Sequence, residues 1–491
     1  MRHLPVDPHT LLTLLTALPL VGLLLWVFTR HCAIAIGLLL GIQIWAVAVG
    51  GQSAALDIGV RIYPADVLTA CALCVALVRV SRRGPSAHAG LFPVMALVVL
   101  AGWSTLRGIA TFGLQAAGND SRVYFWHFLA IALYIATVPQ SAPLGRVVTR
   151  AWLATAAAYA LLSLIGWAGR GLHAANTQVA VGGVAVDSRP VPAAAALVLT
   201  QAAALLLCPL RPGASVPGPA PSRTPEHGGT ADRGEKEGVW RGRARPLAAL
   251  LLLVLVVLLQ HRTIWVAAAA MAVAWWGLRP ARAGQRMASA TAGALVLCLT
   301  VLLFSAGALG AIGGSLADSF RETQGTHSTF AWRVIGWQDL LNAPRSPAQW
   351  LIGAPFGSGY ERYFAGGLVT VSPHDYYLHV MLRLGLAGVV ALLVLYFVVW
   401  RWLVRGGPGT LALRLAVIGQ LVLFVSYSAF PEQAVLLGLS MWQARICAAD
   451  SVMRKSPSGR RDPMATMPRP AATARPGPAW ELHRSAPRAK C

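Results

Sequence analysis

The sequence contains little charge, and acidic residues are the scarcer kind. Only 12% of its 491 residues are charged, and 18 Asp and Glu residues stand against 41 Lys and Arg residues. A soluble globular domain carries about 25% charged residues, so this composition excludes an ordinary soluble protein. Long apolar runs recur along the chain instead, near the ~20 residues that cross a bilayer. Since a bilayer offers no water to backbone amides, such runs must be helices.

Cysteine is also scarce, and the number of cysteines, seven, is odd. Cys71 and Cys74 form a C-x-x-C pair, a spacing found in some redox and zinc sites. The pair lies inside an apolar run, however, with no second ligand pair nearby. We therefore interpret the cysteines as small buried hydrophobic residues.

Closely spaced carboxylates are absent as well. The chain contains no Asp-x-Asp motif, and the acidic residues expected on the outer side of the membrane are scattered. Hard divalent cations require several oxygen ligands. The sequence therefore predicts neither a metal site nor a cofactor.

The apolar runs define the predicted fold. They lie at residues 10–28, 32–49, 63–78, 91–105, 123–139, 151–168, 190–208, 247–260, 263–278, 288–310, 376–400, 411–430 and 434–448. The first two could form a shallow hairpin, and the last is short. We therefore predict an all-α, polytopic transmembrane helical bundle of about 12 to 13 spans. There is no internal repeat, so nothing supports the paired inverted halves of many secondary transporters.

The formal net charge of +23 is concentrated in alternate loops. The basic segments are 79–90, 209–246, 279–286, 401–414 and the tail from 451. By the positive-inside rule these segments face the cytoplasm, which predicts a multi-pass protein of the cytoplasmic (plasma) membrane with an outer amino terminus and an inner carboxyl terminus. The first run lacks a small-residue cleavage site and is expected to be retained. A compact basic face with interleaved aromatics is missing, so we expect no nucleic-acid partner.

These features divide the chain into six expected segments. They are N-terminal transmembrane helices at 1–208, a flexible cytoplasmic linker at 209–246, transmembrane helices at 247–310, a large extracytoplasmic loop at 311–375, C-terminal transmembrane helices at 376–448, and a disordered basic cytoplasmic tail at 449–491.

The loop at 311–375 is the functional candidate, because a long loop inside a compact domain is usually functional or disordered and its aromatic content argues against disorder. Phe330, Val334, Trp337 and Leu341 follow one stripe of an amphipathic helix, which could lie in the outer headgroup plane. A glycine-punctuated segment follows at 350–360 and must turn sharply.

Three cationic or titratable residues stand at the outer face. Arg262 lies in a break between two apolar runs, Arg333 on the loop helix, and His374 at the end of the loop. Each has a simple structural explanation, because an Arg at a helix end is often snorkelling to the interface. His374 beside Asp375 could likewise be only a solvated pair at a helix start.

Two charged residues within the spans carry separate expectations. Asp66 lies in the first turn of a predicted helix, where a carboxylate favours the positive end of the helix dipole. Arg383 lies inside a span, where an unpaired charge is expensive. It is therefore expected to pair within the bundle, with either a structural partner or a ligand.

The arrangement of these residues resembles the O-antigen ligase and polymerase family. The matching segments are Arg262-Thr-Ile-Trp, Phe330-Ala-Trp-Arg-Val-Ile-Gly-Trp337, Leu351-Ile-Gly-Ala-Pro-Phe-Gly-Ser-Gly359 and the segment from His374-Asp-Tyr-Tyr to Gly388. The likeness is strongest from about 247 to 400. One departure is that the family commonly has Asn where this chain has Asp375, which leaves the orientation of the His374 imidazole open.

This resemblance implies transfer of a glycan from a polyprenyl diphosphate carrier to an acceptor hydroxyl on the outer membrane face. By family match, Arg262 and Arg333 bind the diphosphate, to which arginine can make forked bonds. His374 is the candidate general base. Arg122 and Arg189, which open two spans from the outside, either contact carrier phosphates or anchor helix ends.

Alternatives remain on the sequence alone. The enzyme would be either a ligase attaching a finished glycan or a polymerase adding repeat units, and its partners would be a lipid-linked glycan donor, a glycan or lipid acceptor and membrane lipids. A polytopic transporter of an anion or lipid-linked saccharide is the competing class; it predicts ionisable residues near the midplane of several spans. A structural scaffold would leave the Arg, Arg, His spacing unexplained.

Overall fold

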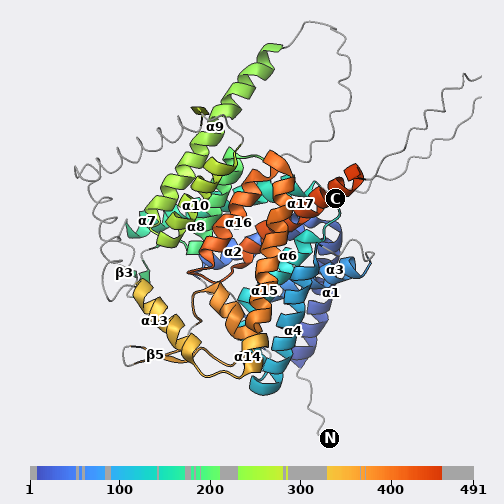
Figure 1. Cartoon of the computed structure of the whole chain (residues 1–491), viewed down its shortest axis with the longest axis vertical. Coiled ribbons are helices and arrows are strands. Elements are labelled where there is room, and N and C mark those ends of the chain that lie inside the picture. The colour runs from blue at the N-terminus through green and yellow to red at the C-terminus, as the bar shows by residue number, and fades with distance from the viewer. Residues whose placement is uncertain are drawn as a thin grey trace, which may run out of the picture.

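The computed structural model describes residues 8–50, 55–57, 61–82, 90–140, 143–171, 178–181, 184–187, 189–210, 231–279, 284–285, 329–364, 367–370 and 372–455. These residues are mostly helical, as the apolar runs predicted, and contain little strand (Figure 1). The amino-terminal helices are α1 (Pro8–Arg30), α2 (Cys32–Ala48), α3 (Pro64–Ser81), α4 (Phe92–Phe112), α5 (Leu114–Ser121), the π-helix η2 (Arg122–His127), α6 (Phe128–Ala136), α7 (Leu144–Arg170) and α8 (Ala193–Leu207).

The helices that the structure describes after residue 230 lie before, within or after the predicted loop at 311–375. They are α9 (Ala231–Leu258), α10 (Arg262–Leu278), α13 (Thr329–Asn342), α14 (Pro347–Ile352), α15 (Tyr376–Arg405), the short 3-10 helix η3 (Gly407–Thr410), α16 (Leu411–Leu423) and α17 (Pro431–Lys455).

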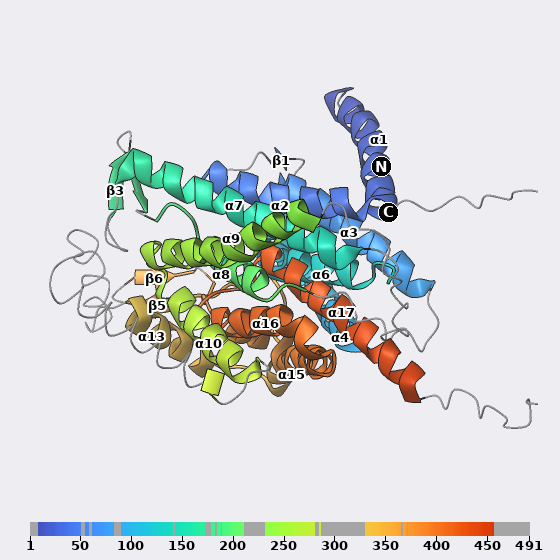
Figure 2. The same ribbon diagram turned by 90° about the horizontal axis from the view of Figure 1, so that it is seen from above.

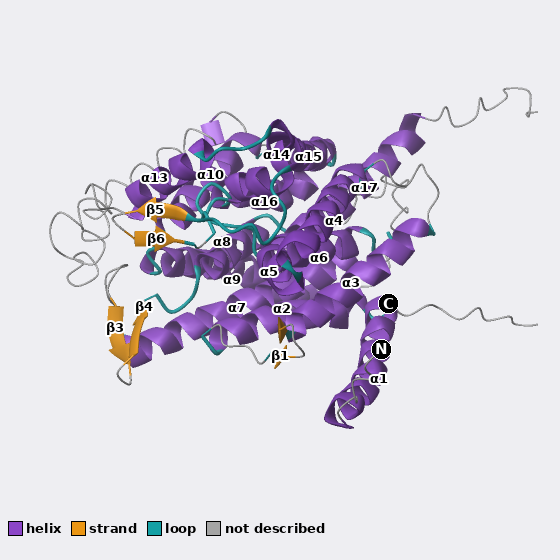
Figure 3. Ribbon diagram, turned by 90° about the horizontal axis from the view of Figure 1, so that it is seen from below, coloured by secondary structure: helices purple, strands orange, loops and turns teal. Residues whose placement is uncertain are grey.

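In the part of the chain that the structure describes, three small antiparallel hairpins connect helices (Figure 3). They are β1 (Leu56–Asp57) with β2 (Arg61–Ile62), β3 (Gln178–Val181) with β4 (Val184–Asp187), and β5 (Arg362–Phe364) with β6 (Gly367–Val369). In the third hairpin Arg362 pairs with Val369. Figure 1 shows β5 beside α13, and α14 beside α15.

The core is formed by helices without an exposed face. Every residue of α6 is buried, and α6 packs against α3 and α17. Nearly all of the alanine-rich α8 is buried against α7, α9 and α16, because small side chains let helix backbones approach closely. In Figure 2, α6 and α8 lie between α2 and α7 on one side and α15 and α16 on the other.

Fewer helices than predicted are long enough to span a membrane. Among the described residues α3, α4, α7 and α15 are long and apolar enough, and the bent α1–α2 pair could count as a fifth span. The count of 12 to 13 spans is therefore not confirmed. One reason is that the run at 123–139 divides into a π-helix and a nine-residue helix. The run at 288–310 lies outside the described residues.

The bend between α1 and α2 measures 119° and agrees with the predicted shallow hairpin. Because α1 ends at Arg30, its last carbonyls lack helical partners. The Phe28 carbonyl instead accepts hydrogen bonds from Nη2 of Arg79, at 3.0 Å, and from the Tyr134 hydroxyl, at 2.8 Å.

The segment predicted as a linker, 209–246, is not extended throughout. Helix α9 begins at Ala231 and continues past residue 246. Its first turns contain Arg, Glu and Lys, which are good helix formers, so a high content of charged residues does not by itself indicate a coil. Residues 211–230 lie outside the described part of the chain.

Two glycines let the loop approach α15 closely. Gly385 interrupts α15 with φ of 67°, and Gly353, with φ of 76°, ends α14. A methyl group on Gly385 would lie 2.4 Å from the Leu351 carbonyl carbon, and one on Gly353 would lie 2.2 Å from the Arg383 carbonyl carbon. The two backbones therefore cross in direct contact, which only glycine allows.

Replacing Gly385 by Ala is expected to destabilise the protein, because both the positive φ and the contact oppose a side chain. The expected loss exceeds ~1 kcal/mol and can be measured by thermal unfolding of the purified protein in detergent. Gly41→Ala in α2 is the matched control, since no atom lies within 4 Å of its Cβ position. Equal melting temperatures for the two variants would contradict the crossing.

Candidate functional site

Helix α13 brings Arg333 to the end of α16. Nη1 of Arg333 donates a hydrogen bond to the Ser426 carbonyl, at 3.2 Å, and its guanidinium lies 5.2 Å from the centre of the Tyr427 ring. Both contacts come from the connection between α16 and α17. Arg333 is therefore held between the predicted loop and the carboxyl-terminal helices.

Arg362, the first residue of β5, packs onto the same helix. A methyl group placed on Gly336 would lie 2.8 Å from Nε of Arg362. Residues three apart share one face of a helix, so Arg362 lies on the face of α13 that also carries Arg333. The Arg362 side chain is buried, and its Nη1 donates to the Tyr360 carbonyl at 3.1 Å.

His374 lies within the electrostatic reach of both arginines and is half-buried. Burial first, and then the charges of Arg333 and Arg362, hold the pKa of His374 below its usual value of 6.5. The imidazole is therefore neutral at neutral pH and able to accept a proton. We call Arg333, Arg362 and His374 the cationic cluster.

Asp375, the departure from the family pattern, acts as a helix cap. Its Oδ1 accepts a hydrogen bond from the Leu378 amide at 2.8 Å at the start of α15. Burial raises the pKa of Asp375 to about 6, against the lowering effect of backbone hydrogen bonds. Asn and Asp are about equally good in this position, so the change from Asn to Asp leaves the start of α15 capped.

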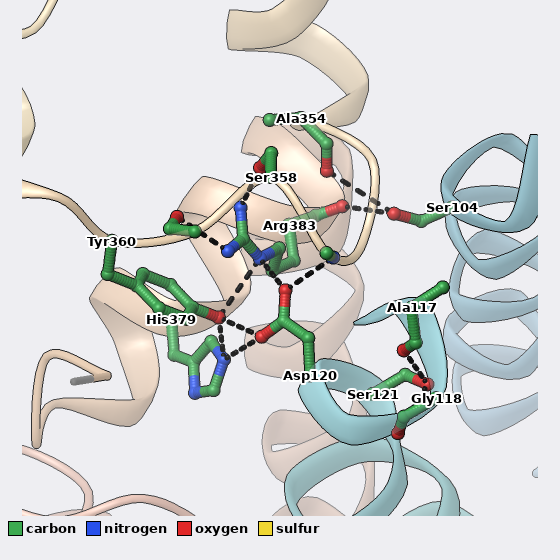
Figure 4. Close-up of polar contacts among 12 residues, drawn as sticks. Ser104, Ala117, Gly118, Asp120, Ser121, Ala354, Ser358, Tyr360, His379 and Arg383 are labelled. Carbon is green, nitrogen blue, oxygen red and sulfur yellow. Dashed lines mark hydrogen bonds and ion pairs between the residues drawn. The ribbon is translucent and has the colours of Figure 1, made fainter. Parts of the chain in front are cut away.

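A second polar group, which we call the buried clamp, consists of Asp120, Tyr360, His379 and Arg383 (Figure 4). Asp120 Oδ2 lies 2.6 Å from Nε of Arg383, and the Tyr360 hydroxyl donates to Asp120 Oδ1 at 2.5 Å. His379 Nε2 contacts the same hydroxyl and lies 3.7 Å from Asp120 Oδ1. The expectation that Arg383 pairs within the bundle is thus met by a structural partner.

The carboxylate of Asp120 is stabilised from several directions. Burial alone would raise its pKa, but hydrogen bonds from His379, Tyr360 and the Gly357 amide, together with the Arg383 charge, outweigh that effect. The pKa of Asp120 therefore lies below its usual value. The Gly357 amide donates to Asp120 Oδ2 at 2.9 Å, so the glycine-punctuated segment binds a carboxylate of the protein itself.

The clamp also distinguishes the two histidines of the last motif. His379 is fully buried, and the rings of Tyr124, Phe125 and Tyr360 enclose it with centroid distances of 5.1 to 5.3 Å. A substrate hydroxyl cannot reach such a ring without displacing the core. His374, which is partly exposed, is the accessible histidine of the pair.

Arg262 and Arg189 lie around the turn between α9 and α10. Gln260 in this turn has φ of 55°, the one positive value among the described residues other than glycine. Nε2 of His261 contacts the Val191 carbonyl at 2.9 Å. Burial, and then the nearby charge of Arg189, lower the pKa of His261 to about 3. Arg262 follows as the first residue of α10.

Arg122 contacts the residues around the start of α3. Its Nη1 lies 3.3 Å from Oδ2 of Asp66 and donates to the Arg61 carbonyl at 3.1 Å, and its guanidinium covers the Tyr63 ring. Asp66 also accepts from the Tyr63 amide at 2.8 Å. These contacts agree with the structural interpretation of Asp66 and favour an anchoring role for Arg122.

The helix predicted for the loop exists as α13. On it Leu341 is 41% exposed, whereas Gly336 and Leu340 are buried. The predicted contact of the apolar stripe with the outer headgroup plane stays a prediction. The Phe330 side chain lies outside the described part of the chain.

Several residues of these sites escaped the sequence analysis. Arg362 carried no motif of its own, and the Asp120 partner of Arg383 lies far away in the chain. The available signal was the cost of an unpaired Arg383, which requires a buried carboxylate. In the described ranges, no group of three or more His, Cys, Asp and Glu side chains could hold a metal ion.

Part of the chain is similar to a known protein family. Residues 247–393 match the family model of the O-antigen ligase. This region runs from α9 into α15 and includes the cationic cluster, Arg262 and three members of the clamp, but not Asp120, Arg122 or Arg189. No curated protein matches the chain.

Proposed function

We propose that this protein, whose residues 247–393 belong to the O-antigen ligase family, transfers a glycan from a polyprenyl (undecaprenyl) diphosphate carrier to an acceptor hydroxyl. The reaction takes place on the outer face of the cytoplasmic membrane. The observation that carries the proposal is the cationic cluster, which combines fixed positive charge with a neutral, accessible imidazole in the family domain.

The arginines stabilise the diphosphate leaving group. During transfer the bond between the anomeric carbon and the diphosphate oxygen breaks, and negative charge grows on the diphosphate. A diphosphate is a stable anion and needs no proton, only cations that bind it more tightly as charge develops. Arg333, held by Ser426 and Tyr427, supplies such a charge in a fixed position.

His374 accepts the proton of the acceptor hydroxyl. The acceptor oxygen forms the new bond to the anomeric carbon, and its proton passes to the imidazole. A base must be unprotonated to do this, and the lowered pKa of His374 keeps the ring neutral at neutral pH. This mechanism needs no metal ion. Arg262, with Arg189 as its neighbour at the α9–α10 turn, is assigned to the carrier diphosphate.

A transfer assay in proteoliposomes tests the proposal. Full-length protein is supplied with an undecaprenyl-diphosphate-linked glycan and a lipid acceptor, with and without EDTA. The expected result is a glycosylated acceptor and free undecaprenyl diphosphate in both conditions, with the rate strongly reduced in Arg333→Gln. Solute uptake without consumption of the lipid-linked glycan would favour a transporter, and loss of activity in EDTA restored by a divalent ion would contradict the metal-free mechanism.

A further inference from the structure

We propose that Arg362 is a further residue that binds the donor diphosphate, and that the buried clamp holds it in position through Tyr360. This inference rests on the proposed function and deepens it. It follows from how Arg362 packs, from the charges around it, and from the chain of contacts behind it.

The packing of Arg362 is specific. Its side chain lies against Gly336 of α13, where a Cβ atom would lie 2.8 Å from Nε, so a larger residue there would displace the Arg362 side chain. Because Arg333 lies three residues earlier on that helix, both guanidinium groups occupy one face. Two arginines on one face can each make forked hydrogen bonds to diphosphate oxygens, so together they hold more of these oxygens than a single arginine does.

The charges of the cluster favour an anionic ligand. Arg333 and Arg362 both act on His374, and each disfavours its protonation. The Asp339 carboxylate acts on Arg362 but is exposed to solvent, where its effect is screened. Like charges gathered in a partly buried site repel one another, and a polyvalent anion between them offsets that repulsion.

The clamp fixes where Arg362 lies. Nη1 of Arg362 donates to the carbonyl of Tyr360, while the hydroxyl of the same tyrosine donates to Asp120 and accepts from Nε of Arg383 at 2.9 Å. Nη2 of Arg383 also donates to the Gly359 carbonyl at 2.8 Å. One residue thus joins Arg362 to a buried ion pair.

The clamp also relates Arg362 to the proposed base. Arg383 lies on α15, and His374 immediately precedes the capped start of this helix. The two residues are therefore about two and a half helical turns apart. Because Tyr360 contacts both Arg362, at the start of β5, and Arg383, these contacts set the distance between the diphosphate site and the His374 imidazole. Arg362 contacts substrate in this proposal, whereas Asp120, Tyr360 and Arg383 are positioning residues.

Kinetics of Arg362→Gln and Arg362→Lys test the assignment in proteoliposomes with the lipid-linked donor. We expect kcat/KM for the donor to fall about 10- to 100-fold in Arg362→Gln, the worth of a hydrogen bond to a charged group, with partial rescue in Arg362→Lys. Removing the positive charge also raises the pKa of His374. The acid limb of the pH profile of kcat/KM, where activity falls as His374 is protonated, therefore moves to higher pH in Arg362→Gln and not in Arg362→Lys. A structural role would leave this limb in place.

The matched control is Arg345→Gln. Arg345 belongs to the same loop but donates to the carbonyls of Leu340 and Leu341 at the end of α13, so donor KM and the acid limb should stay unchanged. An unaltered donor KM and acid limb in Arg362→Gln would overturn the proposal. Titration with inorganic pyrophosphate gives an independent reading: weaker binding by Arg362→Gln supports an anion site even if the wild type transfers no glycan, whereas equal binding contradicts it.

Tyr360→Phe tests the positioning role. It retains the ring and the carbonyl that accepts from Arg362 but removes the hydroxyl shared by Asp120 and Arg383. The expected fall in kcat/KM is about 3- to 10-fold, less than the worth of a hydrogen bond to a charged group, because the hydroxyl affects Arg362 only through the position of Tyr360. In the Arg362→Gln background the same change should have little further effect, because residues acting through one another are not additive. Fully additive effects would contradict the link.

Discussion

Replacing His374 with Ala is expected to lower kcat for glycan transfer by about 10² to 10⁴-fold, the usual contribution of a general base. Donor KM should change little, because the arginines that bind the diphosphate remain. The measurement is the initial rate of acceptor glycosylation in proteoliposomes at saturating donor.

The pH dependence of the wild type checks the same assignment. Since the pKa of His374 is lowered, its neutral form persists below pH 6.5, and the acid limb of kcat/KM should have its midpoint below that value. Activity is present above this midpoint and lost as the pH falls through it. The limb should be absent from the residual activity of His374→Ala.

His31→Ala serves as the control for this substitution. His31 lies at the α1–α2 break and packs against Trp26, away from the predicted loop. We expect wild-type kcat from it. A kcat for His374→Ala within threefold of the wild type would exclude His374 as the base.

The sequence predicted the helices more reliably than their lengths. The apolar runs indicated an all-helical protein, because in a bilayer every backbone polar group must be satisfied internally. Run length did not indicate where helices bend. The α1–α2 bend depends on Arg79 and Tyr134 reaching the Phe28 carbonyl, contacts between segments far apart in the chain.

The candidate site was predictable only in part, for a related reason. Arg333 and His374 could be named because each lies in a motif of the family, and the structure brings them together. Arg362 could not be named, because its position depends on the absence of a side chain at Gly336. The pattern of apolar residues predicted a helix where α13 lies but not the arginine packed against it, since periodicity records hydrophobicity and not the space that a buried arginine occupies.

The second large expected effect concerns the buried ion pair of the clamp. Asp120→Ala is expected to lower the free energy of unfolding by about 3 to 5 kcal/mol, because removing one partner of a buried pair leaves an uncompensated charge. Arg383 is 2% exposed and would keep only its neutral acceptors. The depressed pKa of Asp120 means that this stability is present above its ordinary pKa of 3.8 and lost as the pH falls through the folded value, so the deficit of the variant appears at neutral pH. Thermal unfolding in detergent at pH 7 measures it.

A double replacement separates the charge effect from the loss of packing. In Asp120→Leu with Arg383→Met no charge remains buried, and apolar side chains of similar size often match or exceed a buried ion pair in stability. The double variant should therefore be more stable than Asp120→Ala, yet it should transfer glycan slowly, because Tyr360 would no longer be held and Arg362 with it. Stability within 1 kcal/mol of the wild type for Asp120→Ala would mean that the ion pair is not a main support of the fold. A double variant with restored stability and wild-type kcat/KM would mean that the clamp stabilises the fold but does not position Arg362.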